Sequence, residues 1–167
     1  MKFEVRLCSV LDSGTDIIVN AANNYLSRGG GVCGAIFERA GAELLEAECR
    51  VWGYVKTGSV ATTNGFQSGA KYIIHAVGPN FYIDHQDWQE KLESVYKKSL
   101  LVADDLGVNS IAFPCISTGI FGCPIEESAK IAVRVVREFQ PKNLKNCVLC
   151  CFTDGEYSVY NALLYSK

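Results

Sequence analysis

Two asparagines and a triple glycine stand close together near the start of the chain. Asn20 and Asn23 come at the end of an apolar run, and glycines 29–31 directly precede a segment with helical periodicity. Asparagine side chains offer neutral hydrogen-bonding groups. Glycine lets an anion approach the backbone N–H groups at a helix N-terminus, whose dipole favours negative charge. This combination suits a ligand that carries both sugar hydroxyls and phosphates.

A second segment, residues 117–122, offers the same chemistry. It reads Ser-Thr-Gly-Ile-Phe-Gly, follows an apolar strand-like run and precedes a helical segment. Small residues and glycines there present backbone amides with little steric obstruction. Ligands of parallel sheets bind beyond the carboxyl ends of the strands. We therefore expect both segments to lie at one edge of a sheet and to hold a diphosphate between them.

The elements that must position these segments alternate along the chain. Apolar runs with period two predict strands, and a period near 3.6 predicts helices. Three strands are apolar almost throughout, which is typical of the middle of a parallel sheet covered by helices on both sides. The predicted strands are 3–7, 17–19, 59–62, 72–76, 110–113 and 147–152, and the predicted helices are 32–40, 42–52, 88–106, 125–139 and 156–164.

Composition and charge narrow the class of protein. The chain has 167 residues, of which 49% are hydrophobic and 20% charged, so we expect one domain over 1–167 that folds without a partner. The net charge is −2 and basic residues do not cluster, which argues against broad nucleic-acid binding and against anionic membranes. We find neither a membrane-spanning stretch nor a signal peptide, so a cytoplasmic monomer is the default expectation.

The eight cysteines are expected to be small buried hydrophobic residues, because most lie in or beside apolar strands and a chain of this size needs no disulfides. Cys147 and Cys150 form a Cys-x-x-Cys pair. On a strand, however, an offset of three places them on opposite faces, and no second pair or well-spaced histidine completes a zinc site. We therefore expect no metal and no cofactor.

Gly29, Gly31 and Gly34 match the Gly-x-Gly-x-x-Gly pattern of dinucleotide-binding folds. That site needs a tight strand-to-helix turn and an acidic residue at the end of the next strand. Here residues 20–28 separate the strand from the glycines, and the helical pattern continues to about Trp52 without an intervening strand. The spacing therefore disfavours a dinucleotide-binding fold.

Four ordered motifs resemble those of the macrodomain family. They are Val-Asn-Ala-Ala-Asn at 19–23, Gly-Gly-Gly-Val at 29–32, Ile-His-Ala-Val-Gly-Pro at 74–79 and Ile-Ser-Thr-Gly-Ile-Phe-Gly at 116–122, and the resemblance covers essentially the whole chain. It implies an α/β fold, a three-layer α/β/α sandwich with a mixed, largely parallel central sheet. It also implies binding of ADP-ribose or ADP-ribosylated proteins, with removal of mono-ADP-ribose from protein side chains or deacetylation of O-acetyl-ADP-ribose.

The same resemblance assigns roles to individual residues. Asn23 is expected to hydrogen-bond the distal ribose, the sugar that bears the leaving group, while Asn20 orders the same loop or only closes an Asx turn. Phe152 matches an aromatic residue that packs on adenine, although the residues alone favour a core position. The expected catalytic residues are Asn20, Asn23, Gly31 and Phe121, and the further expected ligand contacts are Ser9, Val10, Gly29, Gly30, Val32, Cys33, Ser117, Thr118, Gly119, Ile120 and Phe152.

One departure from the family's pattern concerns adenine. Many members carry an acidic residue in the turn after the first strand, where it recognises the adenine amino group. Here Ser9 stands at that position, with Asp12 nearby. A hydrogen bond to an ionised acceptor is about twice as strong as a neutral one, so we expect weaker discrimination between adenine and other bases.

A second departure concerns catalysis. Strongly hydrolytic cellular members read Gly-Val-Asp-Gly with a histidine four residues after the aspartate, and this chain has Cys33 and Phe37 at those positions. The obvious general base is therefore missing, and His75, within a strand, is expected to be structural. The open alternatives are a hydrolase in which the substrate's diphosphate positions the attacking water, a reader without turnover, and a nucleotide-metabolite enzyme of different chemistry.

Overall fold

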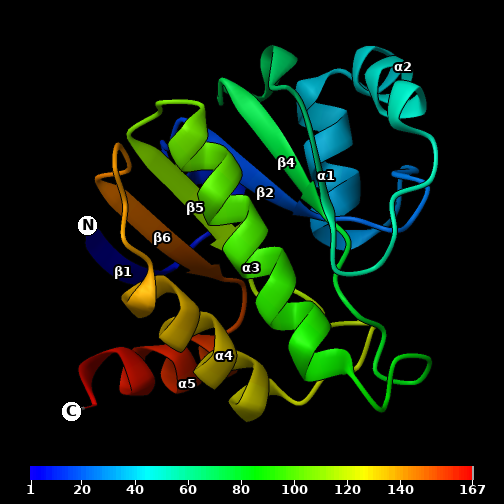
Figure 1. Ribbon diagram of the computed structural model, residues 1–167. Coiled ribbons are helices and arrows are strands. Elements are labelled where there is room, and N and C mark those ends of the chain that lie inside the picture. Colours follow the sequence, from blue (N-terminus) through cyan, green and yellow to red (C-terminus); the bar gives the residue numbers. More distant parts are fainter. Residues whose placement is uncertain (167) are drawn as a thin grey trace.

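The computed structural model describes residues 1–166, and within them six strands form one central sheet (Figure 1). The strands stand in the order β1-β6-β5-β2-β4-β3. All neighbours are parallel except β3 and β4, so the expected mixed, largely parallel sheet is confirmed. The bounds are β1 Lys2–Leu7, β2 Ile17–Ala21, β3 Val60–Asn64, β4 Tyr72–Ala76, β5 Ser110–Pro114 and β6 Asn146–Cys151.

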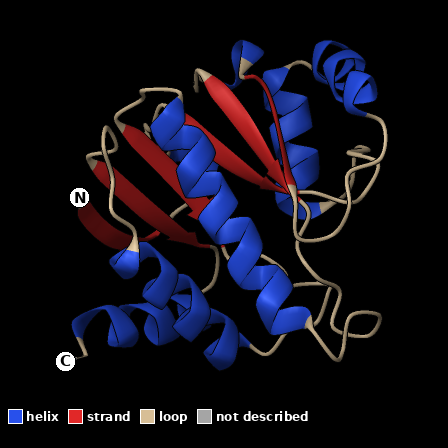
Figure 2. Cartoon of the chain, viewed as in Figure 1, coloured by secondary structure: helices blue, strands red, loops and turns tan. Residues whose placement is uncertain are grey.

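Helices cover both faces of this sheet, which confirms the three-layer sandwich (Figure 2). Helices α3, α4 and α5 pack on one face, and α1 and α2 pack on the other. Two short 3₁₀ turns, Val10–Asp12 and Phe66–Ser68, escaped the periodicity analysis because each is only three residues long. The helices are α1 Gly31–Ala40, α2 Ala42–Trp52, α3 Trp88–Asp105, α4 Ile125–Glu138 and α5 Asp154–Tyr165.

Side chains alternate between the two faces along each central strand, and for this reason the strands are apolar throughout. In β6, Cys147 and Leu149 belong to the cluster beneath α3, α4 and α5, whereas Val148 and Cys150 belong to the cluster beneath α1 and α2. The predicted opposite faces for Cys147 and Cys150 are thus confirmed, and the eight cysteines are free thiols.

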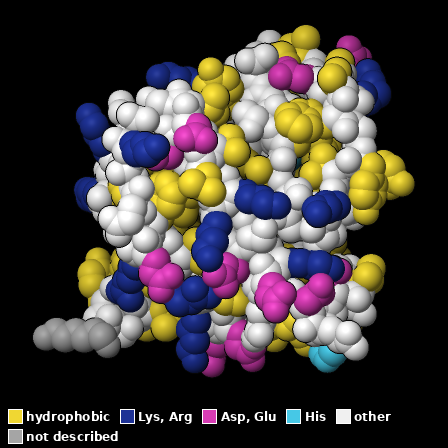
Figure 3. Space-filling view, viewed as in Figure 1, with side chains coloured by type: hydrophobic (Ala, Val, Ile, Leu, Met, Phe, Trp, Pro, Cys, Tyr) yellow, Lys and Arg dark blue, Asp and Glu magenta, His cyan; other side chains and the backbone are white. Residues whose placement is uncertain are grey.

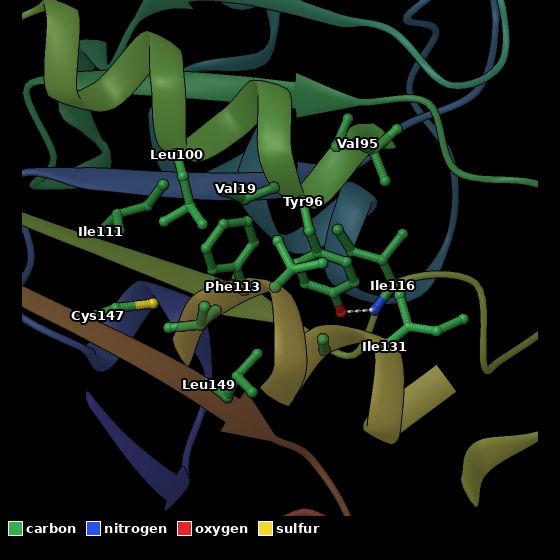
Figure 4. Packing of buried hydrophobic residues seen from close by; sticks show 14 of the residues in the cluster. Val19, Val95, Tyr96, Leu100, Ile111, Phe113, Ile116, Ile131, Cys147 and Leu149 are labelled. Carbon is green, nitrogen blue, oxygen red and sulfur yellow. Dashed lines mark hydrogen bonds between the residues drawn. The ribbon is translucent and has the colours of Figure 1, made fainter. Parts of the chain in front are cut away.

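The larger cluster joins α3 to the middle of the sheet. The ring of Tyr96 on α3 lies against that of Phe113 on β5, with ring centroids 5.0 Å apart, and Figure 4 shows both among apolar neighbours. The Tyr96 hydroxyl accepts a hydrogen bond of 3.4 Å from the N–H of Ile116. Because Ile116 lies just beyond β5, this core also anchors the segment that follows the strand.

Strand β2 runs two residues further than predicted. Its parallel pairing with β4 continues to Ala21, opposite Ala76, and places Asn20 opposite His75. The periodicity analysis ended the strand at Val19 because a polar residue follows it. The continued ladder satisfies backbone groups, and the Asn20 amide finds partners inside the protein, so the strand tolerates the polar residue.

The helices and the charged side chains bear on which surroundings the chain is suited to. Within residues 1–166, no helix is long and apolar enough to cross a bilayer. Basic and acidic side chains are interspersed on the face drawn in Figure 3. This mixture agrees with the net charge of −2.

Candidate functional site

The strand order brings five loops together at the carboxyl edge of the parallel strands. Across the sheet, they follow β1, β6, β5, β2 and β4. Neighbouring strands stand about 4.8 Å apart, so the loops after β1 and β2 are about 14 Å from each other. We call residues 22–30, after β2, the glycine loop and residues 115–124, after β5, the serine loop.

Strands β2 and β5 separate before they reach this edge. Their pairing stops at Ile18 and Ala112, whereas β2 stays paired with β4 as far as Ala21, and β5 stays paired with β6 as far as Pro114. The glycine loop and the serine loop therefore begin on opposite sides of the place where the sheet parts. Ligands of open α/β sheets bind at such a position.

The glycine loop ends at the N-terminus of α1. Gly30 is the N-cap residue, and no side chain caps this helix end, so N–H groups of the first turn remain available to an anion. Gly31 has a φ of +56°, a conformation that favours glycine. A Cβ at Gly34 would lie 2.5 Å from the carbonyl oxygen of Gly29, so a glycine there lets the loop lie against the helix.

Asn23 orders the glycine loop from within. Its Oδ1 accepts hydrogen bonds from the N–H groups of Tyr25 at 3.2 Å and Ser27 at 3.0 Å. Its Nδ2 donates to the carbonyl oxygen of Ser27 at 3.0 Å. An amide nitrogen has two hydrogens, so one donor of Asn23 remains for a ligand.

Asn20 lies inside the protein, on the side of the sheet that α1 and α2 cover. Its Nδ2 is 3.1 Å from Nδ1 of His75 and 3.6 Å from Sγ of Cys33, and its Oδ1 has no partner. The side chain is fully buried and lies against Cys33, in the first turn of α1, so a role of Asn20 in ordering this part of the loop fits its position, and its catalytic role stays a prediction.

His75 completes this buried polar group. Its Nε2 lies 2.9 Å from the hydroxyl oxygen of Thr63 on β3. Burial lowers the pKa of His75 from its ordinary 6.5 to about 4, so the ring is neutral at physiological pH. The structural role expected of His75 fits this position, and the ring is too deep to act as a base on a bound ligand.

Close packing holds the serine loop. Ser117 is buried with a φ of +66°, and its carbonyl oxygen accepts a 2.9 Å hydrogen bond from the N–H of Cys123. A Cβ at Gly78, in the loop after β4, would lie 2.3 Å from Oγ of Ser117. The backbone N–H groups of residues 118–121 have no acceptor within residues 1–166, which leaves a row of free donors.

Phe121 connects the serine loop to the loop after β4. Its carbonyl oxygen accepts a 2.8 Å hydrogen bond from the N–H of Phe81. Beside it lies a hollow of about 660 Å³, which we call the side pocket. The lining of the side pocket includes Asn24, Tyr54, Lys56, Thr57, Ile83 and Phe121.

The loops after β1 and β6 form the other end of this edge. Ser9 caps the 3₁₀ turn, with its Oγ accepting a 3.2 Å hydrogen bond from the N–H of Leu11. Val10 is buried in the free protein, and its contact with a ligand stays a prediction. Phe152 lies one residue past β6 and is 77% exposed, so the core position that the residues alone favoured is wrong. An exposed ring there is free to stack on a base.

The two loops differ from many hydrolytic sites in the kind of side chains that they carry. Neither the glycine loop nor the serine loop carries an aspartate, glutamate or histidine. Cys33 is buried, with its thiol 3.7 Å from the carbonyl oxygen of Ser27. Within residues 1–166, no group of three or more histidine, cysteine or acidic residues is placed to hold a metal ion.

Sequence reasoning missed four residues of the side pocket. Tyr54, Lys56 and Thr57 lie between α2 and β3, where the sequence shows no motif, and Ile83 follows the Gly-Pro turn after β4. Phe121, Gly78 and Asn24, by contrast, lay within segments that the sequence singled out. The exposed tyrosine and isoleucine were the remaining signals, because large apolar residues in loops often mark a binding surface.

Comparison with known proteins agrees with this geometry. The family model described as Macro domain matches residues 19–132. The chain is 48% identical over 149 residues to the macro domain-containing protein RSc0334 of Ralstonia nicotianae, which covers 89% of this chain and 86% of the relative. It is 43% identical over 154 residues to the ADP-ribose glycohydrolase MACROD2 of Xenopus laevis, which covers 89% of this chain and 36% of that protein.

Two solved structures share the fold over almost the whole chain. The structure of the Oceanobacillus iheyensis macrodomain with ADP superposes with a TM-score of 0.89 at 36% identity, covering 96% of this chain and 88% of that one. The Trypanosoma brucei macrodomain in complex with ADP-ribose superposes with a TM-score of 0.88 at 35% identity, covering 96% of this chain and 68% of that one.

Proposed function

The chain belongs to the macrodomain family, and from this premise we propose that it binds ADP-ribose and hydrolyses mono-ADP-ribose from proteins modified on Asp or Glu, deacetylates O-acetyl-ADP-ribose, or does both. One observation carries this proposal: strands β2 and β5 stop pairing before their carboxyl ends, and the two loops that follow them have free backbone N–H groups. Relatives support it, since one is named an ADP-ribose glycohydrolase and another is a complex with ADP-ribose.

The order of the loops matches the order of groups in ADP-ribose. Phe152 and Ser9 stand at one end, where adenine would stack on the exposed ring. The diphosphate would lie between the N-terminus of α1 and the amides of residues 118–121, both of which favour anions. Asn23 and Phe121 stand at the other end, where the free donor of Asn23 would bind the distal ribose.

Because neither loop supplies a base, the hydrolysis that we propose is substrate-assisted. A water held against the diphosphate attacks the anomeric carbon of the distal ribose. The bond from that carbon to the carboxylate oxygen of the modified Asp or Glu breaks, and its electron pair leaves with the carboxylate. The proton of the water passes to a diphosphate oxygen. Orientation of water and ribose supplies the rate acceleration.

A non-catalytic reader is the alternative, and a specific observation favours it. Strongly hydrolytic members of the family carry an aspartate and a histidine where this chain has Cys33 and Phe37, and both of these side chains are buried. Buried apolar side chains cannot activate a water. A reader would use the same contacts to the diphosphate and ribose, and would lack only the turnover.

Release of free ADP-ribose over time from a protein mono-ADP-ribosylated on glutamate tests the proposal. A parallel titration with ADP-ribose measures binding separately. Binding together with release supports the hydrolase. Binding without release, from the glutamate ester and from O-acetyl-ADP-ribose alike, makes the chain a reader. The absence of binding contradicts both functions.

A further inference from the structure

The side pocket opens at the end of the site where the proposed function places the distal ribose. Asn24 in its lining directly follows Asn23, and Phe121 contributes to both the serine loop and the pocket. In a modified protein, the polypeptide is attached to the distal ribose. A group attached there and pointing away from the diphosphate therefore meets the side pocket first.

The side pocket is large enough to hold part of a ligand. At about 660 Å³, it is within the range of about 300–1,000 Å³ that is usual for pockets that bind a ligand. Adenine, diphosphate and ribose are accommodated by the loops after β6, β5 and β2 in the proposed arrangement. The side pocket extends beyond these loops, since Tyr54, Lys56 and Ile83 of its lining belong to other segments.

The wall of the side pocket is held firmly to the site. Nδ2 of Asn24 donates to the carbonyl oxygen of Val55 at 3.0 Å and to Oγ1 of Thr57 at 3.2 Å, and the N–H of Val55 returns a 2.7 Å hydrogen bond to Asn24. These bonds tie the segment between α2 and β3 to the glycine loop. A preformed wall of this kind lowers the entropy cost of binding.

Apolar side chains line the mouth of the side pocket. Tyr54 is 61% exposed and Ile83 is 80% exposed, although both are large and apolar. The ring of Tyr25, from the glycine loop, meets that of Tyr54 edge to face at 5.3 Å. Exposed aromatic and aliphatic side chains around a hollow are typical of a surface that binds another protein.

Lys56 gives the side pocket its charge. The other lysine of the lining, Lys91, pairs with Asp84 at 2.7 Å and with Asp87 at 3.3 Å. Lys56 forms no ion pair with any residue that the structure describes. The lining thus presents one uncompensated ammonium group, which is complementary to a carboxylate.

We propose that the side pocket is the subsite for the modified protein: it takes the polypeptide segment next to the ADP-ribosylated Asp or Glu, with Tyr54 and Ile83 packing on the segment and Lys56 selecting segments that carry further carboxylates. This rests on the proposed binding of ADP-ribose. It adds a preference among modified proteins, which the contacts to ADP-ribose cannot provide.

Two matched peptides test the subsite. Both carry one glutamate modified with mono-ADP-ribose; the flanking residues are glutamates in the first and serines in the second. Preference is measured as kcat/KM if the peptides are cleaved and as Kd if they are only bound. Free ADP-ribose is titrated in parallel. Lys56→Glu is the test variant, and Lys145→Glu, an exposed lysine at the opposite edge of the sheet, is the matched control.

The wild type is expected to prefer the acidic peptide, and Lys56→Glu is expected to reduce the kcat/KM or the affinity for that peptide about five- to tenfold. The same quantities for the serine peptide and for free ADP-ribose should change less than about twofold, and Lys145→Glu should alter none of them.

Ile83→Ser should reduce the kcat/KM or the affinity for both peptides and leave the affinity for free ADP-ribose unchanged. Both variants lie on the surface, so the fold is retained.

Two results would overturn the subsite. In one, Lys56→Glu and Ile83→Ser leave the kcat/KM or the affinity for both peptides unchanged. In the other, they reduce the affinity for free ADP-ribose as much as that for the peptides, which would mean that these residues bind ADP-ribose itself. Failure of the proposed function looks different, because the wild type would then bind neither peptide nor ADP-ribose.

Discussion

The glycine loop and the serine loop present backbone amides at the same edge of the sheet, but they are held in different ways. Three hydrogen bonds of one side chain, Asn23, order the glycine loop from within. The serine loop is held from outside by Gly78, by the Tyr96 hydroxyl and by Phe81. A loop ordered by one polar side chain can lose function while the fold persists. A loop ordered by packing loses both together.

The largest effect is expected from a substitution in the glycine loop, where turnover should fall while the fold is retained. Asn23→Ala removes the loop's internal hydrogen bonds and its donor to the ribose, so turnover of a glutamate-modified protein should fall about a hundredfold, as when one preorganised donor is lost. Unfolding in denaturant should show a loss of stability of no more than about 1 kcal/mol, since the side chain is half-exposed. Asn109→Ala, an exposed asparagine at the other end of the sheet, is the control. Unchanged turnover in Asn23→Ala would remove Asn23 from the site.

The next prediction concerns the serine loop, where fold and function should fail together. In Gly78→Ala, the new Cβ would lie 2.3 Å from Oγ of Ser117 and 2.6 Å from Cγ2 of Ile116. The free energy of unfolding should fall by about 1–3 kcal/mol, and ADP-ribose should bind more weakly. Gly119→Ala is the control for stability, because a Cβ there meets nothing within 4 Å. Equal stability of the two variants would show that the contact between the loops is not tight.

A third prediction tests the support beneath the glycine loop by pH. The pKa of His75 is lowered to about 4 by burial, so between pH 6.5 and 4 the unfolded chain binds a proton that the folded protein does not. Stability therefore falls as the pH falls through this window, by about 1 kcal/mol from pH 6.5 to 5.5. Denaturant unfolding at several pH values measures the slope. In His75→Asn, the slope over this interval should be clearly smaller, and the same slope in the variant would assign it to other groups.

The smallest effect is expected at Cys33. Its thiol makes only long contacts, 3.6 Å from Nδ2 of Asn20 and 3.7 Å from the carbonyl oxygen of Ser27. Cys33→Ala should therefore lower turnover by no more than about threefold, which corresponds to a weak hydrogen bond. A steady-state assay on the glutamate-modified protein measures it. Complete loss of activity in a folded Cys33→Ala protein would instead make the thiol a nucleophile.

Patterns in the sequence predicted the elements and the two loops, because both depend on local chemistry. The glycines, for example, are required by contacts within a few residues, as between Gly34 and Gly29. What failed depended on partners distant in the sequence. Asn20 is part of β2 because its backbone pairs with β4 and its side chain contacts His75. Phe152 is exposed because β6 ends at Cys151, one residue before the end of the apolar run.

The side pocket as a whole could not be predicted from the sequence, because segments distant in the chain form it. Its walls come from the glycine loop, the serine loop, the segment before β3, the loop after β4 and α3, and the segment before β3, with Tyr54, Lys56 and Thr57, carries no pattern of its own. Only the tertiary structure decides that Lys91 is paired with Asp84 while Lys56 has no ion pair among residues 1–166.

The pairing of β1 with β6 has a consequence for how the protein folds. Lys2 lies opposite Asn146, and within residues 1–166 the strand β1 pairs only with β6. Strand β1 therefore cannot join the sheet before the distant strand β6 has formed. Pairing between segments so distant in sequence is slow, because the entropy of closing the intervening chain is lost before the contact stabilises anything. We therefore expect β1, and with it the start of the loop that carries Ser9, to join the sheet late in folding.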